Sequence, residues 1–153
     1  MNILGIDGSN IRHGGGITHL SQLIKHSEQN SFAFDKVILW SNHNTLDQID
    51  DREWLIKKSH PFLNKNLIFR TIWQIFCLKK SLISESCSIL FVLGGSFYTN
   101  FKPVVNFHQN LLPFESKEVL RFGVSFKVLR FYLLKIIQSF SFRRSDGIIF
   151  LST

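Results

Sequence analysis

Residues 2–24, NILGIDGSNIRHGGGITHLSQLI, contain the stretch that decides the fold of this chain. The apolar run at residues 2–6 predicts a buried strand, and the residues from Ile17 onward have helical character. A polar loop that ends in three glycines separates the two segments, as a tight connection into a helix requires. A strand, a glycine-rich turn and a helix in this order are typical of the start of a parallel α/β sheet.

The rest of the 153-residue chain continues this alternation of short apolar runs and longer helical segments. Strands are expected at residues 2–6, 36–40, 54–57, 88–93, 103–107 and 147–151, and helices at about 17–30, 45–50, 67–84 and 117–142. The predicted fold class is α/β, a Rossmann-like open parallel sheet flanked by helices. An apolar content of 44% with 19% charged residues excludes a disordered or repeat chain, and the length favours one domain.

The positive charge of the chain is concentrated towards its C-terminal end. Residues 116–153 hold seven of the 18 basic side chains and two of the 11 acidic ones. A basic block within an apolar, Phe-rich stretch favours an anionic membrane surface, rather than nucleic acid, as a partner. Basic residues interrupt the most apolar stretch, residues 119–142, so no spanning helix is expected. The N-terminus lacks the pattern of a secretory signal, and the expected location is cytoplasmic, with peripheral contact to the membrane.

Gly14, Gly15 and Gly16 lie in the loop that leads into the first expected helix. In an α/β sheet this loop is at the carboxyl edge of the strands, where the free N–H groups of a helix favour phosphate. The dinucleotide fingerprint GxGxxG fails because His19 stands where its third glycine belongs, and no Gly-Lys-Ser or Gly-Lys-Thr is present. Two interpretations remain open, a phosphate contact and a connecting loop without a ligand.

Polar residues also follow the expected strands at 88–93 and 103–107, on the same edge of the sheet. The first of these strands ends in the Gly94-Gly95 turn, and the second ends in His108, Gln109 and Asn110. A histidine at such an edge can deprotonate a hydroxyl, and an asparagine can hydrogen-bond a sugar or phosphate. The alternative is that these side chains only close the loop by bonding to the backbone.

Three segments together resemble a known family. NILGIDGSNIRHGGGITHLSQLI, VLGGSFYTNFKPVVNFHQNLLPFE and FRRSDGIIFLST are similar in content and order to the amino-terminal half of bacterial family 4 glycosyltransferases, which have the two-Rossmann-domain GT-B architecture. The resemblance implies that Gly14, Gly15 and Gly16 lie against the donor diphosphate. It further implies an acceptor side formed by His108, as the catalytic candidate, with Gly95, Gln109, Asn110 and Glu115.

The resemblance implies transfer of a hexose from a nucleotide sugar, with retention and without a metal, to a lipid-linked or cell-surface polysaccharide acceptor. Residues 1–153 would be the acceptor-side domain, incomplete at its C-terminal edge and inactive alone, because the donor-binding domain of the family is absent. The alternative is a noncatalytic Rossmann-like module that docks on membrane and on a separate donor-binding chain. A nicotinamide-dependent oxidoreductase is disfavoured, because Trp40-Ser41-Asn42 stands where that class has an acidic residue.

The expected helix at residues 117–142 has one basic face and one apolar face at about 100° per residue. Two apolar side chains lie among the basic ones, as an interfacial helix requires, and the predicted membrane-surface residues are Lys127, Arg130, Phe131, Leu134 and Lys135. The apolar face is predicted to pack on the sheet through Phe122, Leu129, Leu133, Ile136 and Phe140. An ordinary surface helix that meets another domain or subunit, and a nucleic-acid contact, are the alternatives.

Overall fold

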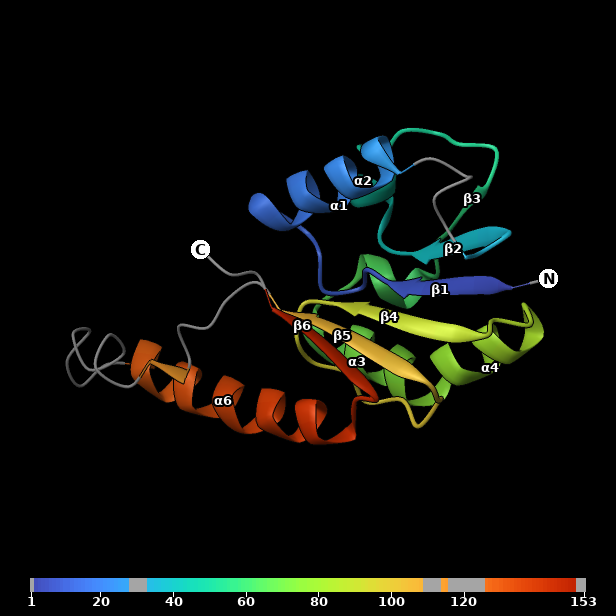
Figure 1. The fold of residues 1–153 in the computed structure, drawn as a ribbon. Coiled ribbons are helices and arrows are strands. Elements are labelled where there is room, and N and C mark those ends of the chain that lie inside the picture. The colour runs from blue at the N-terminus through green and yellow to red at the C-terminus, as the bar shows by residue number, and fades with distance from the viewer. Residues whose placement is uncertain (1, 28–32, 109–113, 116–125, 151–153) are drawn as a thin grey trace.

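The computed structural model describes residues 2–27, 33–108, 114–115 and 126–150, which form an α/β sandwich (Figure 1). Six parallel strands make one open sheet in the order β3-β2-β1-β4-β5-β6. The strands are β1 (Ile3–Asp7), β2 (Lys36–Trp40), β3 (Leu55–Lys58), β4 (Ile89–Leu93), β5 (Val104–His108) and β6 (Gly147–Phe150). The Rossmann-like fold class is confirmed, and the strands lie where their apolar runs predict them.

The helices are α1 (Gly15–His26), α2 (His43–Leu46), α3 (Leu67–Phe76), α4 (Leu78–Ser84) and α6 (Phe126–Arg144), together with the 3-10 helix η2 (Pro61–Asn64). The single helix expected at residues 67–84 is divided at Cys77. The Asn66 side chain caps α3 by accepting a hydrogen bond from the Phe69 N–H at 3.4 Å. Residues 116–125, where the last helix was expected to begin, lie outside the described residues.

The direction of the chain across the sheet reverses at β1, and this determines which face each helix covers. Successive parallel strands are joined by right-handed crossovers, so connections that run in opposite directions lie on opposite faces. Figure 1 shows α1 and α2 on one face, here the α1 face, and α3, α4 and α6 on the other, here the α3 face. The crevice between β1 and β4, at their carboxyl ends, is the topological switch point where ligands bind in this class of sheet.

Each face has its own hydrophobic core. On the α1 face, Leu20 and Ile24 of α1 pack against β-strand residues such as Leu39. On the α3 face, Trp73 and Leu82 pack against residues such as Leu90. These side chains are almost completely buried, so both cores contribute to holding the switch point in place.

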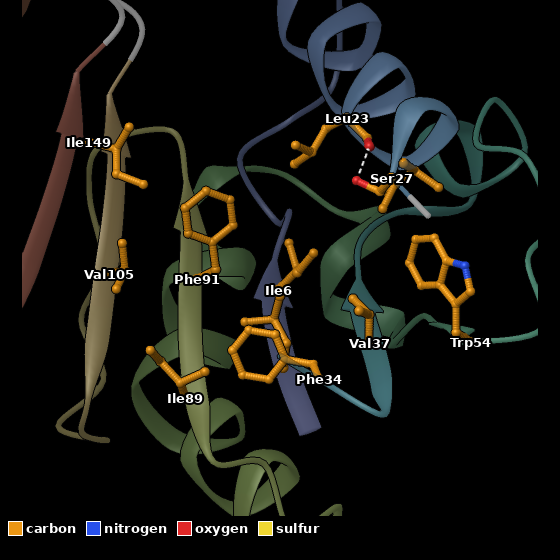
Figure 2. Close-up of a pocket in the computed structure, with 12 residues that line it drawn as sticks. Ile6, Leu23, Ser27, Phe34, Val37, Trp54, Ile89, Phe91, Val105 and Ile149 are labelled. Atoms are coloured by element: carbon orange, nitrogen blue, oxygen red, sulfur yellow. Dashed lines mark hydrogen bonds between the residues drawn. The ribbon is translucent and has the colours of Figure 1, made fainter. Parts of the chain in front are cut away.

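The α1 face is not covered along its whole width. Because the described connections beyond β3 run on the α3 face, none of the described helices lies over β4, β5 and β6 on the α1 face. A pocket of about 230 Å³ remains there, between the sheet and the C-terminal end of α1. Figure 2 shows Phe91, Val105 and Ile149 in its wall, and nearly all of the lining is apolar.

Helix α6 packs in the orientation opposite to the predicted one. The Ser141 hydroxyl accepts a hydrogen bond from the Phe97 N–H at 3.2 Å, and both Ser141 and Gln138 are buried. The prediction that Leu129, Leu133, Ile136 and Phe140 pack on the sheet is wrong, because these side chains are 53–67% exposed. The physical reason is that the loop after β4 presents polar backbone to the helix, which a serine hydroxyl can satisfy and an apolar side chain cannot.

The core on the α3 face provides a stability test. We expect Trp73→Ala to lower the free energy of unfolding by about 3–5 kcal/mol, because the indole is fully buried and its loss leaves a cavity. The matched control is Ile68→Ala on the same helix, where the side chain is 68% exposed and the expected change is within about 0.5 kcal/mol. Urea unfolding followed by circular dichroism measures both, and equal losses would contradict this packing.

Candidate functional site

The loops that follow β1 and β4 meet at the carboxyl edge of the sheet, next to the last residue of β5. Asn10, in the loop after β1, lies beside the turn after β4, with its Cβ 3.2 Å from the position that a Cβ on Gly94 would take. Its side-chain amide donates to the Ser96 carbonyl at 3.5 Å. Gly95 in turn contacts His108, the last residue of β5. The structure therefore brings the loop with the predicted donor contacts close to Gly95 and His108, two of the predicted acceptor-side residues.

A buried carboxyl begins the loop after β1. Asp7 is 1% exposed; its Oδ1 accepts from the Ser9 N–H at 2.9 Å and its Oδ2 accepts from the Gln74 side-chain amide at 2.6 Å. The same amide donates to the Ser9 hydroxyl at 2.9 Å. Burial raises the pKa of Asp7 above its ordinary value of 3.8, and the hydrogen bonds from Ser9 and Gln74 oppose that rise. The carboxyl is shielded from solvent and holds the loop to α3.

Residues after β2 hold the same loop from the other side. The Asn42 side-chain amide and the Thr45 hydroxyl both donate to the Ile11 carbonyl, at 3.1 and 2.8 Å. The Ser41 hydroxyl donates to the Gly8 carbonyl at 2.9 Å. The end of β2, which lacks the acidic residue of a nicotinamide site, thus supports the loop after β1, a role that no motif in the sequence indicates.

Two arginines also fasten the loop after β1. Arg12 donates through Nη2 to the carbonyls of Leu63 and Lys65, the latter at 2.6 Å. Arg70 of α3 donates through Nη1 to the Ser9 carbonyl at 3.1 Å and to Asn10 Oδ1 at 3.4 Å. Arg12 is visible in the sequence as part of the glycine loop, whereas Arg70 is distant in sequence and no motif indicates it.

The three glycines before α1 have different structural requirements. Gly14 has φ +64°, a left-handed conformation that favours glycine, and a Cβ on Gly16 would lie 3.1 Å from Ile11 Cδ1. Gly15 has neither constraint, because a Cβ there meets nothing within 4 Å. No side chain caps the N-terminus of α1. The first turn of this helix is thus open to a ligand.

His108 is buried at the end of β5 and is 2% exposed. Its ring makes edge contacts with Phe114, Phe142 and Phe150, at centroid distances of 6.0, 5.0 and 6.2 Å. A Cβ on Gly95, which has φ +79°, would lie 2.3 Å from His108 Nδ1, so the glycine is needed both for the turn and for the ring. The acceptor-side role of His108 stays a prediction.

The remaining predicted site residues are distributed as follows. Glu115 is exposed, whereas Gln109 and Asn110 lie outside the described residues. Among the predicted membrane-surface residues Arg130 is exposed, Phe131, Leu134 and Lys135 are half-buried, and the side chain of Lys127 is outside the description.

Two buried acceptor atoms next to the turn after β4 have no hydrogen-bond donor within the described residues, namely Asn106 Oδ1 and Gln138 Oε1. Such atoms indicate a place for water or a polar ligand group.

No protein family, no curated protein and no solved structure matches the chain. None of the helices in the described ranges has the length and hydropathy to cross a bilayer. Within the same ranges no three His, Cys, Asp or Glu side chains lie together as metal ligands.

The buried carboxyl of Asp7 predicts a pH dependence of stability. Its pKa is higher in the folded than in the unfolded state, so its stabilising contribution is complete below pH 3.8 and is lost as the pH rises through the raised value. Asp7→Asn stays neutral and can still accept from the Ser9 N–H, while the Gln74 amide can turn its oxygen towards the new amide.

We therefore expect Asp7→Asn to gain stability relative to the unchanged chain as the pH rises from about 4 to about 8. Urea midpoints of the two proteins across this range measure the difference, in which the other titrating groups cancel. Parallel curves would show that the carboxyl is not held in its neutral form.

Proposed function

We propose that the chain is the acceptor-side half of a family 4 glycosyltransferase of GT-B architecture, and that the enzyme transfers a hexose from a nucleotide sugar with retention. The acceptor would be a lipid-linked or cell-surface polysaccharide. The observation that carries the proposal is Gly15, at the uncapped N-terminus of α1. Neither its backbone conformation nor its surroundings require glycine, and close approach of a ligand to the backbone explains the missing side chain.

The chemistry of the site suits a diphosphate. The N–H groups of the first turn of α1 and the partial positive charge of the helix favour an anion. Arg12 adds a full positive charge two residues before the glycines. These groups supply the positive potential that a nucleotide diphosphate needs, so the proposal includes no metal ion and no cofactor other than the nucleotide-sugar co-substrate.

The proposed enzyme needs a second domain to complete its active site. A donor-binding domain would close over the carboxyl edge of the sheet, and the described residues would provide the acceptor side, with His108 and Gly95 beneath it. In the intact enzyme a labelled hexose should pass from one nucleotide sugar to a membrane-derived glycan. Absence of transfer from every nucleotide sugar in a full panel would refute the activity.

Binding by the chain alone can be tested at Gly15. We expect Gly15→Ala to fold normally, since a Cβ meets nothing there, and to bind nucleoside diphosphates about tenfold more weakly, because the methyl group separates the backbone from the phosphate. The measurement is the displacement of amide signals of residues 14–16 in nitrogen-15 NMR spectra. Gly147→Ala in β6, where a Cβ makes ordinary contacts, is the matched control. Equal affinities in all three proteins would contradict a phosphate role for the loop.

A second candidate, a noncatalytic module that docks on membrane and on a separate donor-binding chain, is favoured by α6. The exposed face of this helix carries five large hydrophobic side chains, namely Leu129, Tyr132, Leu133, Ile136 and Phe140. Residues 126–144 include five basic side chains and no acidic one. This combination is typical of helices that bind anionic lipid surfaces, although the membrane contact moves to the face opposite to the predicted one.

Membrane binding through this face can be tested by vesicle sedimentation. We expect Ile136→Asp to reduce binding to anionic vesicles by about tenfold or more, because it loses the burial of one large apolar side chain and gains a like charge. The control is Ile68→Asp on α3, since Ile68 and Ile136 are 68% and 67% exposed. Binding should weaken with salt. Equal binding to neutral and anionic vesicles, or equal losses in both variants, would exclude this surface.

A further inference from the structure

We propose that Arg12 and Arg70 form a binding site for a phosphoryl group, on the α3 side of the loop after β1. Both arginines are connected to the loop after β1, since Arg12 belongs to it and Arg70 hydrogen-bonds to it. Arg70 reaches Ser9 and Asn10 from α3, and Arg12, two residues further along, reaches back to the carbonyls of Leu63 and Lys65. Every acceptor in these bonds is electrically neutral.

Each arginine has a buried donor that lacks an acceptor among the described residues. The Nε atoms of Arg12 and Arg70 are both buried, and neither has a hydrogen-bond partner among the described residues. The ion pairs found within those residues involve other cations, Lys57, Lys58 and Lys102. A buried N–H of a charged group without an acceptor is costly and rare in native structures. The two orphaned Nε–H groups indicate that an acceptor outside the described residues completes the site, and a bound anion can supply it.

The charge of the arginine pair is not balanced locally. The pKa of Arg70 is lowered, first by burial and then by the charge of Arg12, while Asp7 opposes this effect. Burial in turn favours the neutral form of Asp7. Lys65 adds a further cation nearby, with its Nζ 4.6 Å from the centre of the Phe69 ring. The positive potential of this cluster therefore favours a multiply charged anion.

The arrangement suits a phosphoryl group better than a single carboxylate. A guanidinium presents a planar fork of donors that matches phosphate oxygens, and one such fork is sufficient for a carboxylate. Two guanidiniums on different elements can bind different oxygens of one tetrahedral dianion. Arg70 also bonds to Ser9 and Asn10 in the loop after β1, at the switch point where phosphate groups bind in open α/β sheets.

The phosphoryl group has two chemical sources, the diphosphate of the donor and a phosphate carried by the acceptor. The existence of the phosphoryl site does not depend on the proposed glycosyl transfer. Only the choice between the donor diphosphate and an acceptor phosphate rests on that proposed function. A nucleoside diphosphate and a short alkyl phosphate represent the two sources as probes. Inorganic phosphate and pyrophosphate test the shared chemistry.

The direct test observes the arginine Nε–H signals of the unchanged chain by nitrogen-15 NMR while inorganic pyrophosphate is added. We expect the Arg12 and Arg70 signals to shift with one common dissociation constant, because the anion supplies the missing acceptor, whereas sodium chloride at equal ionic strength should not shift them. Arg52, whose Nη2 donates to the Lys25 carbonyl at 3.2 Å, is the internal control. Shifts that chloride reproduces, or that Arg52 shares equally, would overturn the proposal.

Conservative substitution provides the second measurement. Arg70→Lys and Arg12→Lys keep the charge but remove Nε, and we expect each to weaken pyrophosphate binding about tenfold or more, while Arg52→Lys leaves it unchanged. If either lysine variant fails to fold, the NMR titration of the unchanged chain still decides whether the phosphoryl site exists. Competition of the nucleoside diphosphate with pyrophosphate assigns the site to the donor, and competition of the alkyl phosphate alone assigns it to the acceptor.

These results separate the site from the proposed function. Shifts at Arg12 and Arg70, together with no transfer by the intact enzyme from any nucleotide sugar, would support the phosphoryl site and refute the glycosyltransferase. If the Nε–H signals do not shift, and if the intact enzyme transfers the hexose at full rate with either lysine substitution, the phosphoryl site is refuted and the glycosyltransferase proposal is retained.

Discussion

The loop between β1 and α1 is held in place by buried hydrogen bonds, and the candidate site depends on this constraint. Asp7 and Gln74 fasten the start of the loop to α3, and Asn42 and Thr45 hold the Ile11 carbonyl from the end of β2. Backbone groups taken out of water must be paired, so a loop with so many partners has little freedom to move. The glycines that follow it are therefore held on a fixed support, and a loop that is already ordered loses little entropy when a ligand binds to it.

The positions of the strands and their parallel arrangement follow from features that a sequence displays directly. Each strand is a short apolar run with loop residues on both sides, and the right-handed rule restricts how parallel strands can be connected. The orientation of α6 was not predictable in this way. Periodicity separates its two faces but does not say which one meets the sheet, and the answer depends on Ser141 meeting the backbone of Phe97, 44 residues away in the chain. The hydrogen bond to Phe97 therefore determines which face of α6 meets the sheet, and the apolar stripe of the helix stays exposed.

The same limit applies to the site. Gly14–Gly16 and the Gly94-Gly95 turn are recognisable because glycine clusters at the ends of strands are local signals. The supporting residues are not, since Gln74 lies 67 positions from Asp7, and Arg70 lies 61 from Ser9. His108 is an intermediate case: its position at a strand end is visible in the sequence, but its burial against Phe114, Phe142 and Phe150 depends on three other segments.

Two apolar surfaces of the domain have different physical origins. The uncovered part of the α1 face, around Phe91 and Ile149, is a consequence of topology, because every described connection beyond β3 lies on the other face. The exposed stripe of α6 around Ile136 arises from the polar packing of the opposite side of that helix. Whatever covers Phe91 must therefore come from outside the described connections. The α6 stripe is already complete on one continuous helix face, so a flat surface such as a lipid leaflet can bind it without any rearrangement of the sheet.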